Sequence, residues 1–212
     1  MILVSYTHFD SRLPDDRWRH HLHRVSVPVQ SRIRRYHRWQ DRQAGLFGKL
    51  LLQEGLREYG YHDVSLDHLS YNPFGRPFLN LPVDFNISHS HGYVICSMTK
   101  RGRVGIDIEK IRAIDLSDFQ RYVTLKEWNN IQKALSPYER FYEYWTMKES
   151  VIKGDGSGLS IPLEHIHVKG NRAELYHTHW FLEEIGIDSD CKCHLATDLE
   201  NPEIRLRKFQ FH

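Results

Sequence analysis

The stretch Val104-Gly105-Ile106-Asp107-Ile108-Glu109 alternates apolar and acidic residues and predicts a β-strand. Residues i and i+2 of a strand face the same side, so Asp107 and Glu109 point together while Ile106 and Ile108 point into a core. Two carboxylates held side by side repel each other unless a cation lies between them. Mg²⁺ suits such a pair because it prefers oxygen ligands. The alternative is an exposed strand face whose acids pair with Lys or Arg.

A second acidic motif, Trp145-Thr146-Met147-Lys148-Glu149-Ser150-Val151-Ile152-Lys153, lies in a helix predicted from Arg140 to Lys153 and ended by Gly154. Glu149 and Lys153 are four residues apart and therefore share one helix face. Lys148 lies beside that face, rotated by about 100°. An ordinary i,i+4 ion pair on a solvated helix is the alternative. The glycine-rich loop that follows would allow close approach of a ligand to the backbone.

The remaining periodicity predicts an α+β protein. Helices are expected at 31–59, ended by Gly60, and at 124–133, opened by the capping box Thr124-Leu125-Lys126-Glu127. Strands are expected at 1–6, 64–69, 84–87, 93–99, 159–161, 165–169 and 204–211.

The two halves of the chain resemble each other at a nearly constant offset. A shift of about 98 residues places 41–60 on 139–158 and 93–99 on 191–197, and a shift of 97 places 66–69 on 163–166. Chance similarity is the alternative, because identity between the segments is low. The repeat predicts a duplicated α+β unit packed as a pseudo-dimer, with a ligand site between its halves.

The composition narrows the possible functions. With 29 Lys and Arg against 27 Asp and Glu, the net charge of +2 gives no reason to expect nucleic acid or a membrane as partner. The three cysteines are odd in number, and Cys191 and Cys193 are too close for a typical disulfide, so a reducing, cytoplasmic setting is expected. The 15 histidines are scattered and form no His-Glu-x-x-His frame.

Four motifs occur in a fixed order: Gly75-Arg76-Pro77, Phe85-Asn86-Ile87-Ser88-His89-Ser90, the strand motif at 105–109 and the helical motif at 145–153. Together they resemble the 4′-phosphopantetheinyl transferase superfamily, in its long, monomeric Sfp-type branch, over residues 30 to 166. The resemblance implies two α+β lobes related by a pseudo-twofold axis, and we place them at residues 1–102 and 103–212. It also implies coenzyme A as cosubstrate and an apo acyl or peptidyl carrier protein of fatty-acid, polyketide or nonribosomal-peptide synthesis as acceptor.

By the same resemblance, Asp107, Glu109 and Glu149 coordinate Mg²⁺, and Glu149 accepts the proton of the carrier serine. Asp107, Glu149 and Lys153 are the expected catalytic residues. The residues expected to contact coenzyme A are Arg32, Arg42, Arg76, Ser88, His89, Lys148 and Lys153. The sequence departs from the family at Ala44, where relatives often carry a second arginine, so one phosphate contact is absent or supplied by another residue such as Arg38.

Two other functions stay open at this point. One is a non-catalytic paralogue that binds coenzyme A or a carrier protein without transfer, although such binding needs no general base. The other is a Mg²⁺-dependent hydrolase of pyrophosphate bonds. A Ser-His-Asp hydrolase is disfavoured, because there is no Gly-x-Ser-x-Gly motif and the adjacent Ser88 and His89 would face apart on an extended chain.

Overall fold

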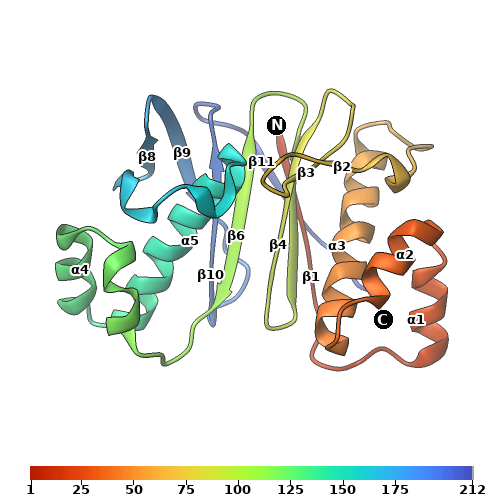
Figure 1. Ribbon diagram of the computed structural model, residues 1–212, viewed down its shortest axis with the longest axis horizontal. Coiled ribbons are helices and arrows are strands. Elements are labelled where there is room, and N and C mark those ends of the chain that lie inside the picture. Colours follow the sequence, from red (N-terminus) through yellow and green to blue (C-terminus); the bar gives the residue numbers. More distant parts are fainter. Residues whose placement is uncertain (212) are drawn as a thin grey trace.

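The computed structural model describes residues 1–211 and, at Leu159, the backbone alone. The chain forms two lobes, each a β-sheet covered on its outer face by one long helix (Figure 1). The two sheets face each other through an apolar cluster to which Ile2, Ile95, Ile106 and Leu195 belong. The layers are therefore helix, sheet, sheet and helix, and the predicted α+β class is confirmed.

The first lobe contains most of the residues before 102. Its helices are α1 (Asp15–Leu22), α2 (Val27–Arg34), α3 (Trp39–Glu58) and the 3₁₀ helix η1 (Leu66–His68). Its strands are β1 (Ile2–His8), β2 (Ser70–Tyr71), β3 (Pro77–Phe78), β4 (Asp84–Ser90) and β5 (Tyr93–Thr99). Strands β2 and β3 form a small hairpin of their own.

The second lobe begins at β6. Its helices are η2 (Leu116–Tyr122), α4 (Leu125–Gln132), α5 (Pro137–Asp155), η3 (Gly158–Ser160) and η4 (Leu163–His165). Its strands are β6 (Val104–Lys110), β7 (Ile166–Lys169), β8 (Arg172–Leu175), β9 (Thr178–Glu184) and β10 (Cys191–Thr197). They form one sheet in the order β6-β10-β9-β8-β7.

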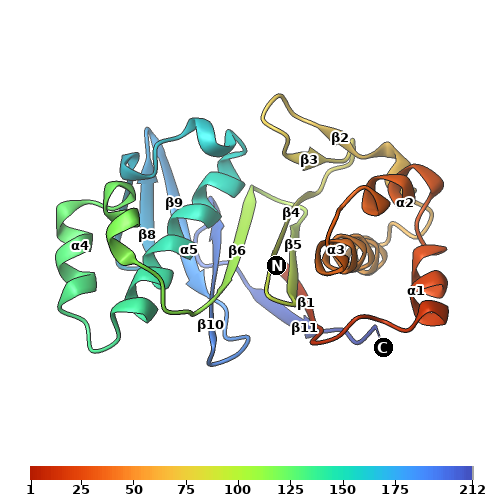
Figure 2. The same cartoon turned by 60° about the horizontal axis from the view of Figure 1, so that its bottom comes forward.

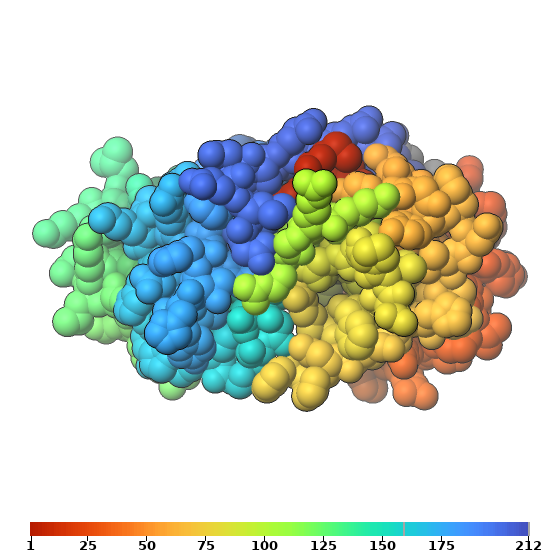
Figure 3. All heavy atoms as spheres, turned by 90° about the horizontal axis from the view of Figure 1, so that it is seen from above, coloured from red at the N-terminus to blue at the C-terminus, as the bar shows by residue number. Residues whose placement is uncertain are grey.

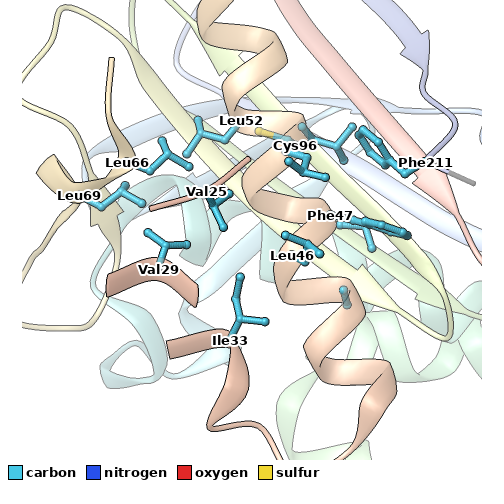
Figure 4. Close-up of a cluster of buried hydrophobic side chains, with 14 of the residues drawn as sticks. Val25, Val29, Ile33, Leu46, Phe47, Leu52, Leu66, Leu69, Cys96 and Phe211 are labelled. Carbon is cyan, nitrogen blue, oxygen red and sulfur yellow. The ribbon is translucent and has the colours of Figure 1, made fainter. Parts of the chain in front are cut away.

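The last strand, β11 (Ile204–Lys208), returns to the first lobe. It pairs with β1 in parallel and completes a sheet of order β11-β1-β5-β4. Beyond it, Phe211 enters the core of the first lobe, where its ring lies 5.0 Å from that of Phe47 (Figure 4). The division at residue 102 stays a prediction, and His212 lies outside the described residues.

The internal repeat is confirmed at the level of secondary structure. Helix α3 corresponds to α5, and the ranges of β5 and β10 differ by the predicted 98 positions. The 3₁₀ helices η1 and η4 differ by the predicted 97 positions. A long helix, a 3₁₀ turn and a central strand of the first lobe therefore each have a counterpart in the second, in the same order.

The helix predicted at 31–59 is wrong in its first part. Helix α2 ends at Arg34 and α3 starts at Trp39. Ile33 and Leu46 belong to the same core (Figure 4), whereas one continuous helix would hold them about 20 Å apart. The break at residues 35–38 allows α2 to fold back, so that Ile33 and the ring of Tyr36 pack near Gly45 of α3.

Two predicted strands and one predicted helix end are also wrong. Residues 64–69 and 159–161 include the 3₁₀ turns η1 and η3 instead of strands. The side chain of Ser65 caps η1 by accepting a hydrogen bond from Asp67 N, which favours a turn over extended chain. Helix α5 continues past Gly154 to Asp155, and Gly156, with a left-handed φ of 87°, ends it. The capping box at Thr124 is confirmed.

Two glycines allow α5 to lie directly on β6. A side chain at Gly105 would collide with the backbone of Ser150 and Gly154, and one at Gly154 would meet the ring of Trp180. The close approach brings the acidic face of β6 against the helix. No helix within residues 1–211 combines the length and apolar character needed to span a membrane.

Candidate active site between the lobes

Strands β4 and β6 lie side by side where the two lobes meet (Figure 2), although they belong to different sheets. Side chains of β4 replace the missing backbone ladder, because four alternate residues accept hydrogen bonds from alternate N–H groups of β6. The pairs are Val104 N to Asp84 Oδ2 (2.8 Å), Ile106 N to Asn86 Oδ1 (3.0 Å), Ile108 N to Ser88 Oγ (3.4 Å) and Lys110 N to Ser90 Oγ (3.3 Å). The edge of β6 is thus satisfied by polar side chains from the other lobe.

The acidic face of β6 points towards α5, as the alternation predicts. Ile106 and Ile108 are fully buried in the cluster between the sheets, and Asp107 is 2% exposed on the opposite face. Glu109 lies farther along this face and Glu149 projects from α5, both half-buried. The structure therefore brings the three predicted acids to one region between a strand and a helix.

Lys153 joins the two lobes at this region. Its Nζ lies 2.5 Å from Asp107 Oδ1 on β6 and donates a hydrogen bond to Ser88 Oγ on β4 at 2.9 Å. Ser88 in turn donates to Asp107 Oδ1 at 3.0 Å. Burial acts to lower the pKa of Lys153, but the charge and hydrogen bond of Asp107, with the charges of Glu149 and Glu109, raise it. The lysine is therefore held as a cation among three acids.

The acids themselves carry an excess of negative charge. Burial and then the charge of Asp107 raise the pKa of Glu109 to about 6, against a hydrogen bond from Ser90 that lowers it. Burial and the charge of Asp107 likewise raise the pKa of Glu149. Both shifts show that the site would be stabilised by more positive charge than Lys153 alone supplies.

These oxygens fit a hard divalent cation. Asp107 Oδ2 is buried and makes no hydrogen bond within the described part of the chain, so one carboxylate oxygen is left for another ligand. Carboxylate oxygens are the ligands that Mg²⁺ prefers. Within residues 1–211, no three His, Cys, Asp or Glu side chains already surround a common metal position. The cation that contacts Asp107 in this structure is Lys153.

A pocket of about 280 Å³ opens beside the acids. Arg76, Asn86, Glu149 and Lys153 contribute polar groups to its lining, and Phe74 and Ile152 contribute apolar surface. At the top of the molecule the region of the β2–β3 hairpin meets the end of α5 (Figure 3), where Asn72 Nδ2 donates to Gly156 O at 2.7 Å. The pocket is therefore built from both lobes.

Arg76 lines this pocket and also ties the lobes together. Its guanidinium donates to Gly154 O (2.9 Å) and Val104 O (2.9 Å) in the second lobe and forms an ion pair with Asp84 (2.8 Å) in the first. Only its Nε is buried without a hydrogen-bond partner in the described chain. The predicted ligand-binding arginine is thus held by protein contacts on one side and faces the pocket on the other.

A second pocket, of about 540 Å³, lies farther along β4. His89, Arg38, Asp41 and Glu109 take part in its lining. Desolvation and the charge of Lys153 lower the pKa of His89. Ala44 also lines this pocket, and Arg38 supplies a guanidinium there.

Lys148 is not brought to either pocket. It is 1% exposed, forms an ion pair with Glu127 of α4 at 2.7 Å and donates to Leu163 O at 3.2 Å. Glu127 is also the capping-box residue of α4 and accepts from Thr124 N. The side chain of Lys148 therefore anchors α4 to α5 inside the second lobe.

Arg32 and Arg42 likewise lie outside the lining of the two pockets at β4. Arg32 stacks on the ring of Tyr71 in the small hairpin, 4.9 Å from its centroid. Arg42 donates from Nε to Tyr36 O at 2.7 Å and lines a separate pocket with Arg12, Arg34 and Trp39. Arg38, in the break between α2 and α3, is the arginine whose side chain shares a pocket with His89.

Sequence reasoning missed Asn86 and Ser90 as parts of the site. Their signal is visible in Asp84-Phe85-Asn86-Ile87-Ser88-His89-Ser90, where every second residue is short and polar, although β4 is largely buried. It also missed His194, which faces Asp107 across the β6–β10 register and contacts Thr146 Oγ1 through Nδ1 at 2.7 Å. Burial lowers the pKa of His194 to about 4.

Two family models match the chain. Residues 103–202 match the 4′-phosphopantetheinyl transferase superfamily, and residues 14–101 match the amino-terminal part of 4′-phosphopantetheinyl transferases. The two matches together cover both lobes of the structure.

Several curated proteins are similar over most of the chain. The 4′-phosphopantetheinyl transferase Sfp of Bacillus subtilis (strain 168) is 33% identical, over 68% of this chain and 66% of that protein. The 4′-phosphopantetheinyl transferase gsp of Aneurinibacillus migulanus is 32% identical, over 71% and 64%. The 4′-phosphopantetheinyl transferase ffp of Bacillus subtilis is 30% identical, over 79% and 80%. The chain thus spans slightly less than two thirds of the first two relatives and four fifths of the third.

Proposed function

Because the chain belongs to the 4′-phosphopantetheinyl transferase superfamily, we propose that it transfers the phosphopantetheine arm of coenzyme A to a serine of an apo acyl or peptidyl carrier protein. The single observation that supports this most is the convergence of Asp107, Lys153 and Ser88 from three elements at the junction of the lobes. That junction lies beside a pocket lined by Arg76 and Glu149, so a pyrophosphate would meet cations and acids together.

Asp107, Glu109 and Glu149 are the proposed ligands of Mg²⁺. The orphaned oxygen of Asp107 and the raised pKa values of Glu109 and Glu149, caused by burial and the charge of Asp107, support this assignment. When bound, the metal would offset charge on the phosphoryl oxygens and on the leaving group.

The reaction exchanges one phosphorus–oxygen bond for another. The serine oxygen of the carrier forms a bond to the β-phosphorus of coenzyme A, and the bond from that phosphorus to 3′,5′-ADP breaks. Glu149 accepts the serine proton, a role for which its raised pKa suits it. Lys153, which stays charged, stabilises the negative charge that develops on the transferred phosphoryl group.

The contacts proposed for coenzyme A follow the two pockets along β4. Arg76 and Lys153 would bind phosphates from the smaller pocket, and Ser88 lies between the pockets on the same strand. His89 and Arg38 would bind from the larger pocket. We propose that Lys148 has a structural role and does not contact a phosphate. Its ion pair with Glu127 anchors α4 to α5.

The other parts of the proposal rest on the resemblance and the composition. The carrier protein would belong to fatty-acid, polyketide or nonribosomal-peptide synthesis. The enzyme would act as a monomer, because both lobes that enclose the site come from one chain. A reducing cytoplasm suits three cysteines that are all unpaired and buried.

The test is to incubate the protein with an apo carrier protein, coenzyme A and Mg²⁺ and to weigh the carrier by mass spectrometry. We expect a mass gain equal to phosphopantetheine and an equal amount of 3′,5′-ADP. A carrier whose acceptor serine is replaced by alanine is the control and should gain nothing. No gain across a panel of acyl and peptidyl carriers would contradict the proposal.

Two other results would point to different functions. Release of 3′,5′-ADP without any carrier would indicate a hydrolase. Calorimetric binding of coenzyme A with no product from any carrier would indicate a binding protein. The Glu149→Gln variant tests the proposed transfer reaction itself, since the variant should abolish transfer while coenzyme A still binds.

A further inference from the structure

Ser88 and Ser90 make the same pair of contacts two residues apart. Ser88 Oγ donates to Asp107 Oδ1 (3.0 Å) and accepts from the N–H of the next residue, Ile108 (3.4 Å). Ser90 Oγ donates to Glu109 Oε2 (2.7 Å) and accepts from the N–H of Lys110 (3.3 Å). Each serine of β4 therefore holds one acidic side chain of β6 and the backbone directly after it.

The direction of the Ser90 hydrogen bonds follows from its chemistry. A hydroxyl has one proton to donate, and a backbone N–H can only donate to it. An ionised carboxylate can only accept, so the bond between Ser90 and Glu109 uses the hydroxyl proton. His91 Nδ1 lies 3.1 Å from the same oxygen and can fill its other lone pair. Ser90 is 7% exposed, which leaves water little access to this arrangement.

Glu109 depends on its serine more than Asp107 does. Asp107 is already held by Lys153 and Ser88. Glu109 is half-buried, forms no ion pair within residues 1–211, and Ser90 makes the one side-chain hydrogen bond to its carboxylate there. A glutamate has three side-chain torsions to fix, so a hydrogen bond at its end selects one orientation among several.

We propose that Ser90 is a positioning residue for the reaction: its hydroxyl, supplied by the first lobe, holds the carboxylate of Glu109 in the orientation that binds the divalent cation. The proposal rests on the proposed function, because it presumes that Glu109 is a metal ligand. Outer partners that orient metal-binding side chains commonly contribute 10- to 100-fold to metal affinity. Ser90 is part of the Ser-His-Ser motif, but it acts on the protein's own carboxylate and not on coenzyme A.

The test measures Mn²⁺ affinity directly, with coenzyme A present and no carrier protein, from the electron paramagnetic resonance signal of free Mn²⁺. We expect Ser90→Ala to weaken Mn²⁺ binding by about 10- to 100-fold. Ser90→Thr keeps the hydroxyl and should stay within about threefold of the original protein. Ser90→Cys, a poorer donor of similar size, should fall between the two.

Ser5→Ala is the matched control. Ser5 is 1% exposed in β1 and its hydroxyl has no partner in the described chain, so removing it deletes the same atom from a buried strand away from the acids. Its Mn²⁺ affinity should be unchanged. Near-ultraviolet circular dichroism of each variant reports the folded fraction, to which the affinities are normalised.

The outcomes distinguish the inference from the function on which it rests. If the unmodified protein binds no more Mn²⁺ than coenzyme A alone, the proposed metal site is overturned. If it binds Mn²⁺ and both Ser90→Ala and Ser90→Cys bind equally well, the positioning role is overturned. In transfer assays, Ser90→Ala should raise the metal concentration for half-maximal rate and leave kcat at saturating metal within about threefold, whereas an equal loss at all metal concentrations would contradict the role.

Discussion

Lys153 on α5 and Asp107 on β6 form an ion pair of 2.5 Å in which one partner is almost fully buried and the other partly exposed. The pair holds the helix on the strand at the position where a divalent cation is proposed to bind. A metal bound at the free Oδ2 of Asp107 would share this carboxylate with Lys153, which contacts Oδ1, and the two positive charges would compete for it electrostatically, although both are proposed to act on a pyrophosphate. Ser88, from the other lobe, also accepts a hydrogen bond from Lys153. The first lobe therefore contacts the same lysine at the junction of the lobes.

Replacing Lys153 with methionine should destabilise the protein by about 2 kcal/mol when no metal is present. Loss of one partner of a fully buried pair costs about 3–5 kcal/mol, and the partial exposure of Lys153 reduces that figure. Mg²⁺ should then restore more stability to Lys153→Met than it adds to the original protein. Urea unfolding with and without Mg²⁺ measures both effects, and an equal response of the two proteins to Mg²⁺ would contradict the competition.

Replacing Lys148 with methionine should lower stability without affecting coenzyme A binding. The Glu127 carboxylate would remain buried without its ammonium partner, at a cost of about 3–5 kcal/mol. The double variant with Glu127→Gln should recover part of this loss. Calorimetry should give a coenzyme A affinity within about twofold of the original protein. A tenfold weaker affinity for coenzyme A at unchanged stability would instead indicate that Lys148 contacts coenzyme A.

Gly105→Ala should destabilise the protein by about 3 kcal/mol, because the new methyl group would overlap the backbone of α5 at Ser150 and Gly154. Gly186→Ala is the matched control, since nothing lies within 4 Å of a side chain built there and its effect should stay within about 0.5 kcal/mol. Equal urea midpoints for the two variants would show that β6 and α5 are not in close contact.

The alternation of residues 104–109 predicted strand β6 and also the side on which its acids lie. Ile106 and Ile108 are buried between the sheets, and Asp107 lies on the opposite face. The repeat at an offset of 98 residues correctly aligned β10 with β5 and α5 with α3. What periodicity could not show is where β6 finds its hydrogen-bond partners. The polar residues of the buried strand β4 contradict the pattern expected of a core strand when that strand is considered alone. They are explained once β6 lies beside β4 and donates its N–H groups to them.

Placement of the basic residues depended on tertiary structure. Lys148 and Lys153 are neighbours in one motif, yet one points into the second lobe and the other to the junction, since five residues rotate a helix by about 140°. Arg38 and Arg42 also separate: Arg38, directly before α3, lines the pocket that contains His89, whereas Arg42 of α3 lines a different pocket with Arg34. The charge of these four residues could not show which of them would lie at the junction of the lobes and which would lie elsewhere.

His194 should make folding stability depend on pH. Burial lowers its pKa to about 4 from an unfolded value of 6.5, so between these values the unfolded state binds one more proton than the folded state. Stability should therefore rise from pH 4 to pH 6.5, with a contribution from this residue of about 3 kcal/mol in total. His194→Gln, which does not titrate, should show a slope shallower by up to about 1.4 kcal/mol per pH unit. Urea unfolding across this range tests it, and parallel curves for the two proteins would contradict the assignment.

The return of β11 to β1 has a consequence for synthesis on the ribosome. Domains usually fold as they emerge, the amino-terminal one first. Here the first lobe lacks an outer strand and the ring of Phe211 until residues 204–211 have been made, which happens after all strands of the second sheet have been synthesised. The edge of β1 therefore stays open until β11 has been made, so the sheet of the first lobe is completed after the strands of the second.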